Sequence, residues 1–124
     1  IDVLGTVGEE QKDALLANAR FACMPSRYEG WGIAAVEAQA AGKAVLATQI
    51  SGLQDAVCHG ETGHLVVPDD VSALADGMRY LLDSESVRAQ MEGRARAWAR
   101  RFDWDQLALD QEGVYLKAIE VNSD

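Results

Sequence analysis

Short apolar runs recur about every 20 residues along the first half of the chain, and helical patterns separate them. The predicted strands are residues 1–5, 21–25, 44–48 and 64–67, and the predicted helices are residues 9–19, 33–41 and a shorter piece at 53–57. Strands that alternate with helices at this spacing form right-handed βαβ units and lie parallel in one sheet. We therefore predict an α/β fold, a Rossmann-like parallel sheet with flanking helices.

Pro68 ends this alternation, and the rest of the chain is predicted to be an all-helical tail. Its first helix starts at an N-cap, Asp69 or Asp70, since both types readily cap helices. The apolar stripe of this helix is formed by Leu74, Met78 and Leu81. Such a stripe predicts a helix that packs one face on the sheet.

Two more helical patterns follow, and each has a recognisable end. The apolar face of the first comprises Val87, Met91, Ala95 and Trp98. Its C-terminal arginines, where the helix dipole favours positive charge, are expected to form a solvated face; they are Arg94, Arg96, Arg100 and Arg101. The last helix opens at Asp103 with Gln106 three residues later, a capping-box arrangement.

The charge balance excludes one class of partner. The 124 residues carry 20 acidic and 11 basic side chains, a net charge of -9. Nucleic acid is therefore not expected as a partner, because phosphate backbones are met by clustered Lys and Arg. The same balance argues against an anionic membrane surface, but peripheral membrane association of a longer parent is left open.

The cysteines and the N-terminal sequence suggest the setting of the chain. Cys23 and Cys58 form no CxxC motif, and two buried thiols in a reducing cytosol are expected rather than a disulfide. A cytoplasmic location follows from this expectation. The chain opens with IDVLG, already inside a strand pattern, and residues 1–124 are predicted to be a single, partial domain of a longer protein.

Two glutamates in the stretch SRYEGWGIAAVEAQAAGKAVLAT, residues 26–48, need an explanation. The segment from residue 33 to residue 48 is nearly all apolar or small, yet Glu37 lies within it, eight residues after Glu29. Burial of a lone carboxylate is costly unless it finds partners. A loop with Gly30 and Gly32 joins a predicted strand to a predicted helix here, at the edge where α/β sheets bind ligands.

A nucleotide sugar satisfies these groups together. A phosphate is expected on the free N–H groups around Gly32, Ile33 and Ala34, at the positive end of the helix. Glu37 is then placed to accept both protons of a vicinal diol, and Glu29 to reach a second hydroxylated group. Two plainer interpretations stay open, in which Glu29 only complements the helix dipole and Glu37 faces solvent.

The run from residue 25 to residue 48 resembles the signature of retaining glycosyltransferases of the GT-B fold, family 4 type. It has the strand that ends in Pro-Ser, then E-G-W-G, a second Glu eight residues after the first, and A-x-A-x-G. The resemblance continues through residues 51–57, 59–78 and 101–104. It implies the C-terminal, donor-binding half of such an enzyme, which transfers a hexosyl unit from a nucleotide diphosphate sugar and needs no bound metal or other cofactor.

The resemblance also implies a role for each residue of the motif. Glu29 corresponds to the catalytic-site glutamate that holds hydroxyls of the donor sugar, and Glu37 to the glutamate that binds the ribose. Donor contacts through the main chain are implied for Gly30, Trp31, Gly32, Ile33 and Ala34, and contacts to the base for Thr6 and Val7. Trp31 takes a position often filled by Phe.

Other parts of such an enzyme are expected outside this chain. Family members place a basic diphosphate clamp upstream of the strand that resembles residues 1–5, and the acceptor site in an N-terminal domain. His59 and His64 are interpreted as turn or strand-end residues, and Arg27 as a surface residue. The isolated chain is expected to bind donor weakly and to be inactive. A non-catalytic nucleotide-sugar binding module and a sugar-nucleotide epimerase of the same fold remain alternatives.

The strand order of the family makes a further prediction about residues 1–5. The order is 3-2-1-4-5-6, and the four predicted strands resemble the third to the sixth. The strand at 21–25 then has a bare edge, which favours pairing with another chain. We expect residues 1–5 either to pair with this edge or to leave it open for self-association.

Overall fold

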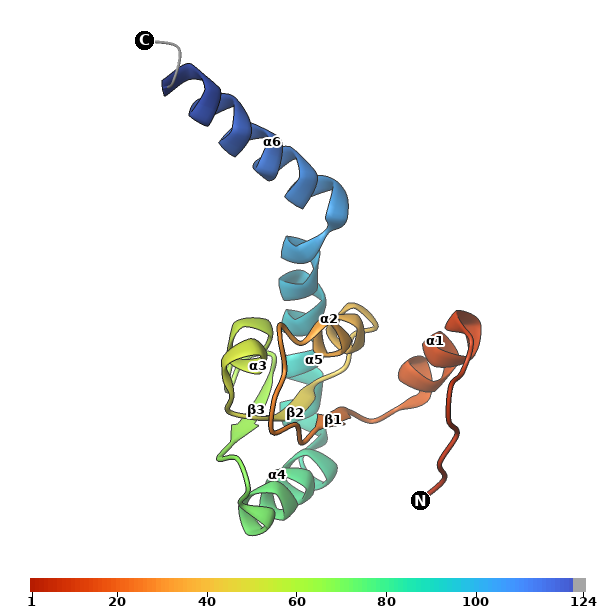
Figure 1. Ribbon diagram of the computed structural model, residues 1–124. Coiled ribbons are helices and arrows are strands. Elements are labelled where there is room, and N and C mark those ends of the chain that lie inside the picture. Colours follow the sequence, from red (N-terminus) through yellow and green to blue (C-terminus); the bar gives the residue numbers. More distant parts are fainter. Residues whose placement is uncertain (122–124) are drawn as a thin grey trace.

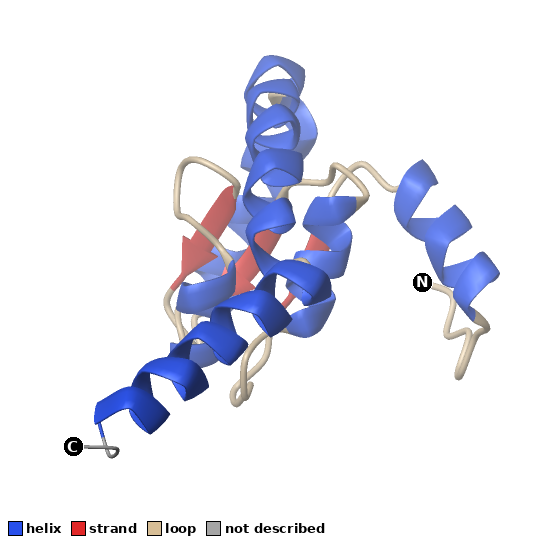
Figure 2. Ribbon diagram, turned by 90° about the horizontal axis from the view of Figure 1, so that it is seen from above, coloured by secondary structure: helices blue, strands red, loops and turns tan. Residues whose placement is uncertain are grey.

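The computed structural model describes residues 1–121 and contains a three-stranded parallel sheet with helices on both faces (Figure 1, Figure 2). The strands are β1 (Ala22–Met24), β2 (Val45–Thr48) and β3 (Gly63–Val66), and they lie in the order β1-β2-β3. Val45 pairs with Ala22 on one side and with Gly63 on the other. The predicted α/β class is confirmed, as are these three strands and their parallel direction.

Six α-helices and one short 3₁₀ helix complete the described part of the chain. They are α1 (Glu9–Asn18), α2 (Ile33–Ala40), α3 (Ser51–Ala56), α4 (Val71–Asp83), α5 (Glu85–Ala99), η1 (Arg100–Phe102) and α6 (Trp104–Val121). Figure 1 shows that α1 stands apart from the sheet and that α6 leads away from it. Among residues 1–121, no helix is long and apolar enough to cross a lipid bilayer.

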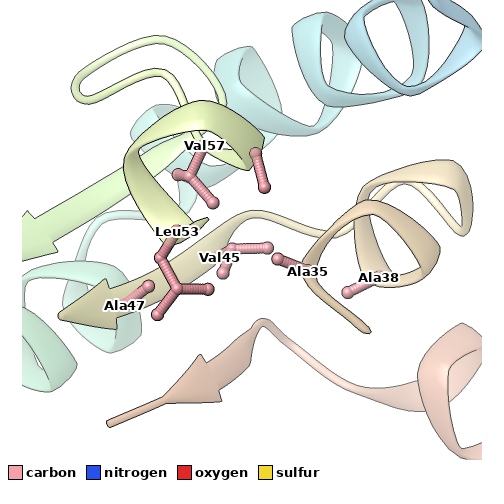
Figure 3. Packing of buried hydrophobic residues seen from close by; sticks show 7 residues of the cluster. Ala35, Ala38, Val45, Ala47, Leu53 and Val57 are labelled. Carbon is pink, nitrogen blue, oxygen red and sulfur yellow. The ribbon is translucent and has the colours of Figure 1, made fainter. Parts of the chain in front are cut away.

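The central strand β2 divides the core into two clusters. Val45 and Ala47 pack with Ala35 and Ala38 of α2 and with residues of α3, as Figure 3 shows. Leu46 points to the opposite face, because successive side chains of a strand alternate between its two faces. It packs there with Val66 of β3 and with the apolar faces of α4 and α5, which contribute Leu81 and Met91. Helices therefore cover both faces of β2, and its four residues are buried.

Two glycines allow close packing around this sheet. A Cβ on Gly63 would lie 2.1 Å from the carbonyl oxygen of Val45, so the backbone itself leaves no room for a side chain. A Cβ on Gly77, in α4, would lie 2.7 Å from Cδ1 of Leu46. The first glycine permits the pairing of β2 with β3, and the second lets α4 approach the sheet.

The ends of the helices are stabilised by local hydrogen bonds. Gly42, with a φ of 77°, ends α2: its N–H donates to the Gln39 carbonyl, and the N–H of Lys43 donates to that of Ala38, each at 2.9 Å. This pair of bonds is a Schellman motif, in which glycine is the favoured residue. At the start of α4, the Asp70 carboxylate accepts the N–H of Ala73 at 2.8 Å, so Asp70 is the N-cap.

The capping box predicted at residue 103 forms only in part. Oδ1 of Asp103 accepts the N–H of Asp105 at 3.0 Å and that of Gln106 at 3.3 Å. The Gln106 side chain turns away and donates to Asp110 at 2.9 Å. A carboxylate one turn further along competes successfully for this exposed amide, so the return bond to the cap is absent.

The strand predicted at residues 1–5 is wrong. These residues form no regular secondary structure, and Ile1, Val3 and Leu4 are exposed. Within residues 1–121 β1 pairs with β2 alone, so residues 1–5 have not paired with its free edge. A run of apolar residues becomes a strand only where a neighbour satisfies its backbone groups. Self-association through the β1 edge stays a prediction.

The glycine at the start of β3 generates a stability test. Gly63→Ala should lower the free energy of unfolding by about 2–3 kcal/mol, because the new methyl group collides with backbone rather than with a flexible side chain. Gly93, inside α5, has nothing within 4 Å of its Cβ position. Gly93→Ala should therefore raise the free energy of unfolding by about 0.5–1 kcal/mol. Urea denaturation followed by tryptophan fluorescence measures both; equal effects would contradict the packing described here.

Candidate functional site

The loop between β1 and α2 carries the first predicted site residues and rests on α3. Glu29 is half-buried, and a Cβ on Gly52 would lie 2.5 Å from the carbonyl oxygen of Glu29. Gly32, buried and with a φ of 76°, has its Cβ position 3.1 Å from Cβ of Ala56 and 3.1 Å from Cδ2 of Leu53. The loop thus touches both ends of α3, and glycine is required at each contact.

The first turn of α2 offers unpaired donors, as predicted. The carbonyl of Gly32 accepts the N–H of Ala35 at 2.9 Å and that of Val36 at 3.2 Å, so the helix begins there. In the part of the chain that the structure describes, the N–H groups of Gly32, Ile33 and Ala34 donate to no backbone carbonyl. Unpaired donors at the positive end of a helix dipole form a binding place for an anion.

Glu37 lies one turn later on the same helix and is not buried. Its side chain is 42% exposed, and its Oε1 lies 3.2 Å from Nζ of Lys12, which also pairs with Glu9 at 2.7 Å. The hydrogen bonds to Glu9 and Glu37 raise the pKa of Lys12 above its usual value. The residue that the apolar stretch encloses is instead Gln39, which is fully buried.

The Gln39 side chain binds α2 to α3. Its Nε2 donates to the carbonyl of Ala35 at 3.1 Å and to that of Ala56 at 2.8 Å, while Oε1 has no hydrogen-bond partner among the described residues. The Ala56 carbonyl also accepts Nε1–H of Trp98, at 2.9 Å. One oxygen at the end of α3 therefore receives donors from both α2 and α5.

A chain of aromatic contacts leads from the loop to this same oxygen. The ring of Trp31 meets Phe102 at 4.9 Å between centroids, and Phe102 meets Trp98 at 5.7 Å, both edge to face. Edge-to-face pairs at such separations are attractive beyond the area they bury. Trp31, from the loop, is thus supported by residues of α5 and η1.

Two hollows meet at Glu37. One, of about 390 Å³, lies between α2 and the start of α6 and is lined by Trp31, Ile33 and Phe102 among others. The other, of about 400 Å³, lies between α1 and α2 and is lined by Lys12, Asp13 and Ala40 among others. A ligand on Glu37 is therefore open to contacts from either side of the helix.

The remaining predicted residues are less closely connected to this site. Thr6 is exposed and Val7 half-buried in the segment before α1, and among residues 1–121 neither forms a hydrogen bond with residues 29–37. Gly30 is exposed in the loop. Arg27 is exposed and pairs with Asp69 at 2.7 Å, which is the surface role predicted for it.

The histidines and cysteines take structural roles. Nδ1 of His59 accepts the N–H of Leu65 at 2.9 Å, and the His64 ring lies between His59 and Tyr80, with centroids 5.0 and 5.4 Å away. Cys23 and Cys58 are free thiols, and burial raises the pKa of both. Within residues 1–121 no three His, Cys, Asp or Glu side chains are grouped to hold a metal ion.

Comparison with known proteins decides the family. The model of the family "Glycosyl transferases group 1" matches residues 1–98. The chain belongs to this family. This group 1 chain is 42% identical over 109 residues to a glycogen synthase of Mycobacterium tuberculosis, with 85% of this chain and 26% of that protein covered. It is 41% identical over 116 residues to an MMP alpha-(1->4)-mannosyltransferase of Mycolicibacterium hassiacum, with 91% and 28% covered.

Solved structures support the same assignment. Sucrose-phosphate synthase from Thermosynechococcus elongatus superposes with a TM-score of 0.86 at 30% identity, covering 95% of the group 1 chain and 30% of that structure. HepE of Anabaena, solved in complex with UDP and glucose, superposes with a TM-score of 0.83 at 27% identity, covering 94% and 32%. The predicted GT-B fold is confirmed, and the chain spans about a quarter of the length of its curated relatives.

Several residues that shape the site were not predicted from the sequence. Lys12, Gly52 and Phe102 lie outside the motif and approach it only through the tertiary fold. Gln39 did give a signal, since it is a polar residue between alanines in a stretch that reads as buried. The burial that this stretch indicates belongs to Gln39, whereas the Glu37 side chain is 42% exposed.

The histidine pair generates a prediction about pH. Burial, with His59 as a lesser cause, lowers the pKa of His64 from its ordinary 6.5. The unfolded chain therefore takes up this proton at a higher pH than the folded chain does. The contribution of His64 to the free energy of unfolding should be fully present above pH 6.5 and should be lost as the pH drops through the lowered pKa.

His64→Leu provides the matched comparison, because it keeps an apolar body in β3 and removes the titrating group. The free energy of unfolding of this variant should fall less steeply between pH 7.5 and pH 5 than that of the unmodified chain. Urea denaturation at several pH values measures the two slopes. Parallel slopes would show that His64 does not carry the pH dependence.

Proposed function

We propose that this chain is the donor-binding part of a retaining glycosyltransferase, which transfers a hexosyl group from a nucleotide diphosphate sugar to an acceptor hydroxyl. One arrangement carries the proposal. The unpaired N–H groups at residues 32–34 lie between the loop that holds Glu29 and the helix position of Glu37. A nucleotide sugar has its diphosphate between a ribose diol and a hexose, in the order of these three protein groups.

Each group is assigned to one part of the donor. The N–H groups of Gly32, Ile33 and Ala34 bind the distal phosphate, since an anion at a helix N-terminus is favoured by dipole and hydrogen bonds together. Glu37 accepts both hydroxyl protons of the ribose, which requires it to leave Lys12. Glu29 holds hydroxyls of the hexose, and main-chain groups of Gly30 and Trp31 complete that contact.

The matched structures support the choice of ligand. HepE of Anabaena was solved with UDP, and again with UDP and glucose. In this proposal the base is bound by main-chain groups at Thr6 and Val7. The reaction proceeds without a metal ion. Retention of configuration follows from the family 4 resemblance, in which the leaving phosphate helps deprotonate the incoming hydroxyl on the same face.

The ribose assignment is tested at Glu37. Glu37→Gln keeps the shape of the side chain but replaces one acceptor oxygen by a donor. With charge-assisted bonds worth about 1.5–3 kcal/mol, affinity for UDP should fall at least about tenfold. Isothermal titration calorimetry of the chain with UDP measures this. Glu112→Gln, in α6, is the matched control and should bind as the unmodified chain does; unchanged UDP affinity in the Glu37 variant would overturn the assignment.

The sugar assignment at Glu29 has a different signature. Glu29→Gln should lower affinity for UDP-glucose by about fivefold to tenfold and leave affinity for UDP nearly intact, because the hexose contact alone is weakened. The same titrations with both ligands measure the ratio. If affinity for UDP fell as much as affinity for UDP-glucose, the assignment of Glu29 to the hexose and of Glu37 to the ribose would be wrong.

A further inference from the structure

The loop between β1 and α2, called the donor loop here, is held in its conformation by contacts with residues outside it. Residues 27–31 form no backbone–backbone hydrogen bond within the part of the chain that the structure describes. At the start of the loop, the hydroxyl of Thr48 donates to the carbonyl of Ser26, and further along Gly52 approaches Glu29. The side chain of Glu29 therefore depends on contacts made by neighbouring residues of the loop.

Trp31 provides such a contact two residues after Glu29. The residue is 37% exposed, and an edge-to-face contact joins its ring to Phe102 at a centroid distance of 4.9 Å. Phe102 is half-buried and is held in turn by Trp98, at 5.7 Å. The contact thus joins the loop to the junction of α5 and η1, about 70 residues later in the chain.

Trp98 cannot shift freely, because its indole is anchored. Nε1–H donates to the Ala56 carbonyl at 2.9 Å, and the guanidinium of Arg101 lies 4.6 Å from the centre of its ring. Ala56 also lies beneath Gly32, the last residue of the loop. The loop is therefore fixed against α3 twice, directly through its glycines and indirectly through Trp31, Phe102 and Trp98.

We propose that Phe102 and Trp98 are positioning residues for sugar binding, which hold the Glu29 loop in its binding conformation through the ring of Trp31. This inference rests on the proposed function for its consequence in donor binding, but the structural link stands on the ring contacts alone. In this proposal each residue acts through Trp31 and not through a contact of its own with the donor. Phe102 should therefore affect the sugar end of the ligand and not the nucleotide end.

The structural link is tested by ¹⁹F NMR of the chain labelled with 5-fluorotryptophan. The Trp31 signal, assigned with Trp31→Phe, should move toward the position of the free amino acid in Phe102→Leu. It should stay in place in Phe102→Tyr, which keeps the aromatic edge. Trp98→Phe should also move it, whereas Trp104→Phe, a matched change at a residue that is 79% exposed, should not. An unmoved Trp31 signal in Phe102→Leu overturns the proposal.

The functional consequence is tested by titrating the same variants with UDP and with UDP-glucose. Phe102→Leu should reduce the ratio of UDP-glucose affinity to UDP affinity at least threefold, and Phe102→Tyr should restore it. A moved Trp31 signal with an unchanged ratio would overturn the positioning role. If the unmodified chain binds neither ligand, the proposed function fails for these ligands, and the ¹⁹F signal alone decides whether Phe102 holds the loop.

Discussion

The carbonyl oxygen of Ala56 is the point at which three helices are joined. It receives the side-chain amide of Gln39 from α2 and the indole N–H of Trp98 from α5, 42 residues later. A carbonyl at the end of a helix has no partner within that helix, and leaving it unpaired in the core costs about 1–3 kcal/mol. Because α2 and α5 both satisfy it, the position of α3 beneath the loop between β1 and α2 is fixed relative to each.

The site therefore draws its shape from residues that its motif does not contain. The motif brings two glutamates and three glycines, but its loop rests on Gly52 and on the Phe102 ring. The motif does determine the helix that follows, since Gly32 opens α2 and Gly42 closes it. Local chemistry thus gives the helix ends, and packing between distant elements gives the position of the loop.

This division explains what could be predicted from the sequence. Periodicity depends on neighbouring residues, so it predicted the three paired strands, the helices around them and the apolar faces of α4 and α5. Periodicity failed at residues 1–5, because a strand forms only beside a neighbouring strand and the local sequence does not show whether one is present. It also failed to separate Glu37 from Gln39, because two residues of helix, about 200° of rotation, reverse which face a side chain occupies.

Helix α6 has a spectroscopic consequence. It is 18 residues long and buries none of them, so its stability depends on intrinsic helix formation more than on packing. On heating, the ellipticity of α6 at 222 nm should decrease gradually. The near-ultraviolet band of Trp98 should instead be lost in one cooperative step, when the sheet and its flanking helices unfold. The two melting curves would then not coincide, and a far-ultraviolet midpoint would understate the stability of the part that carries the site.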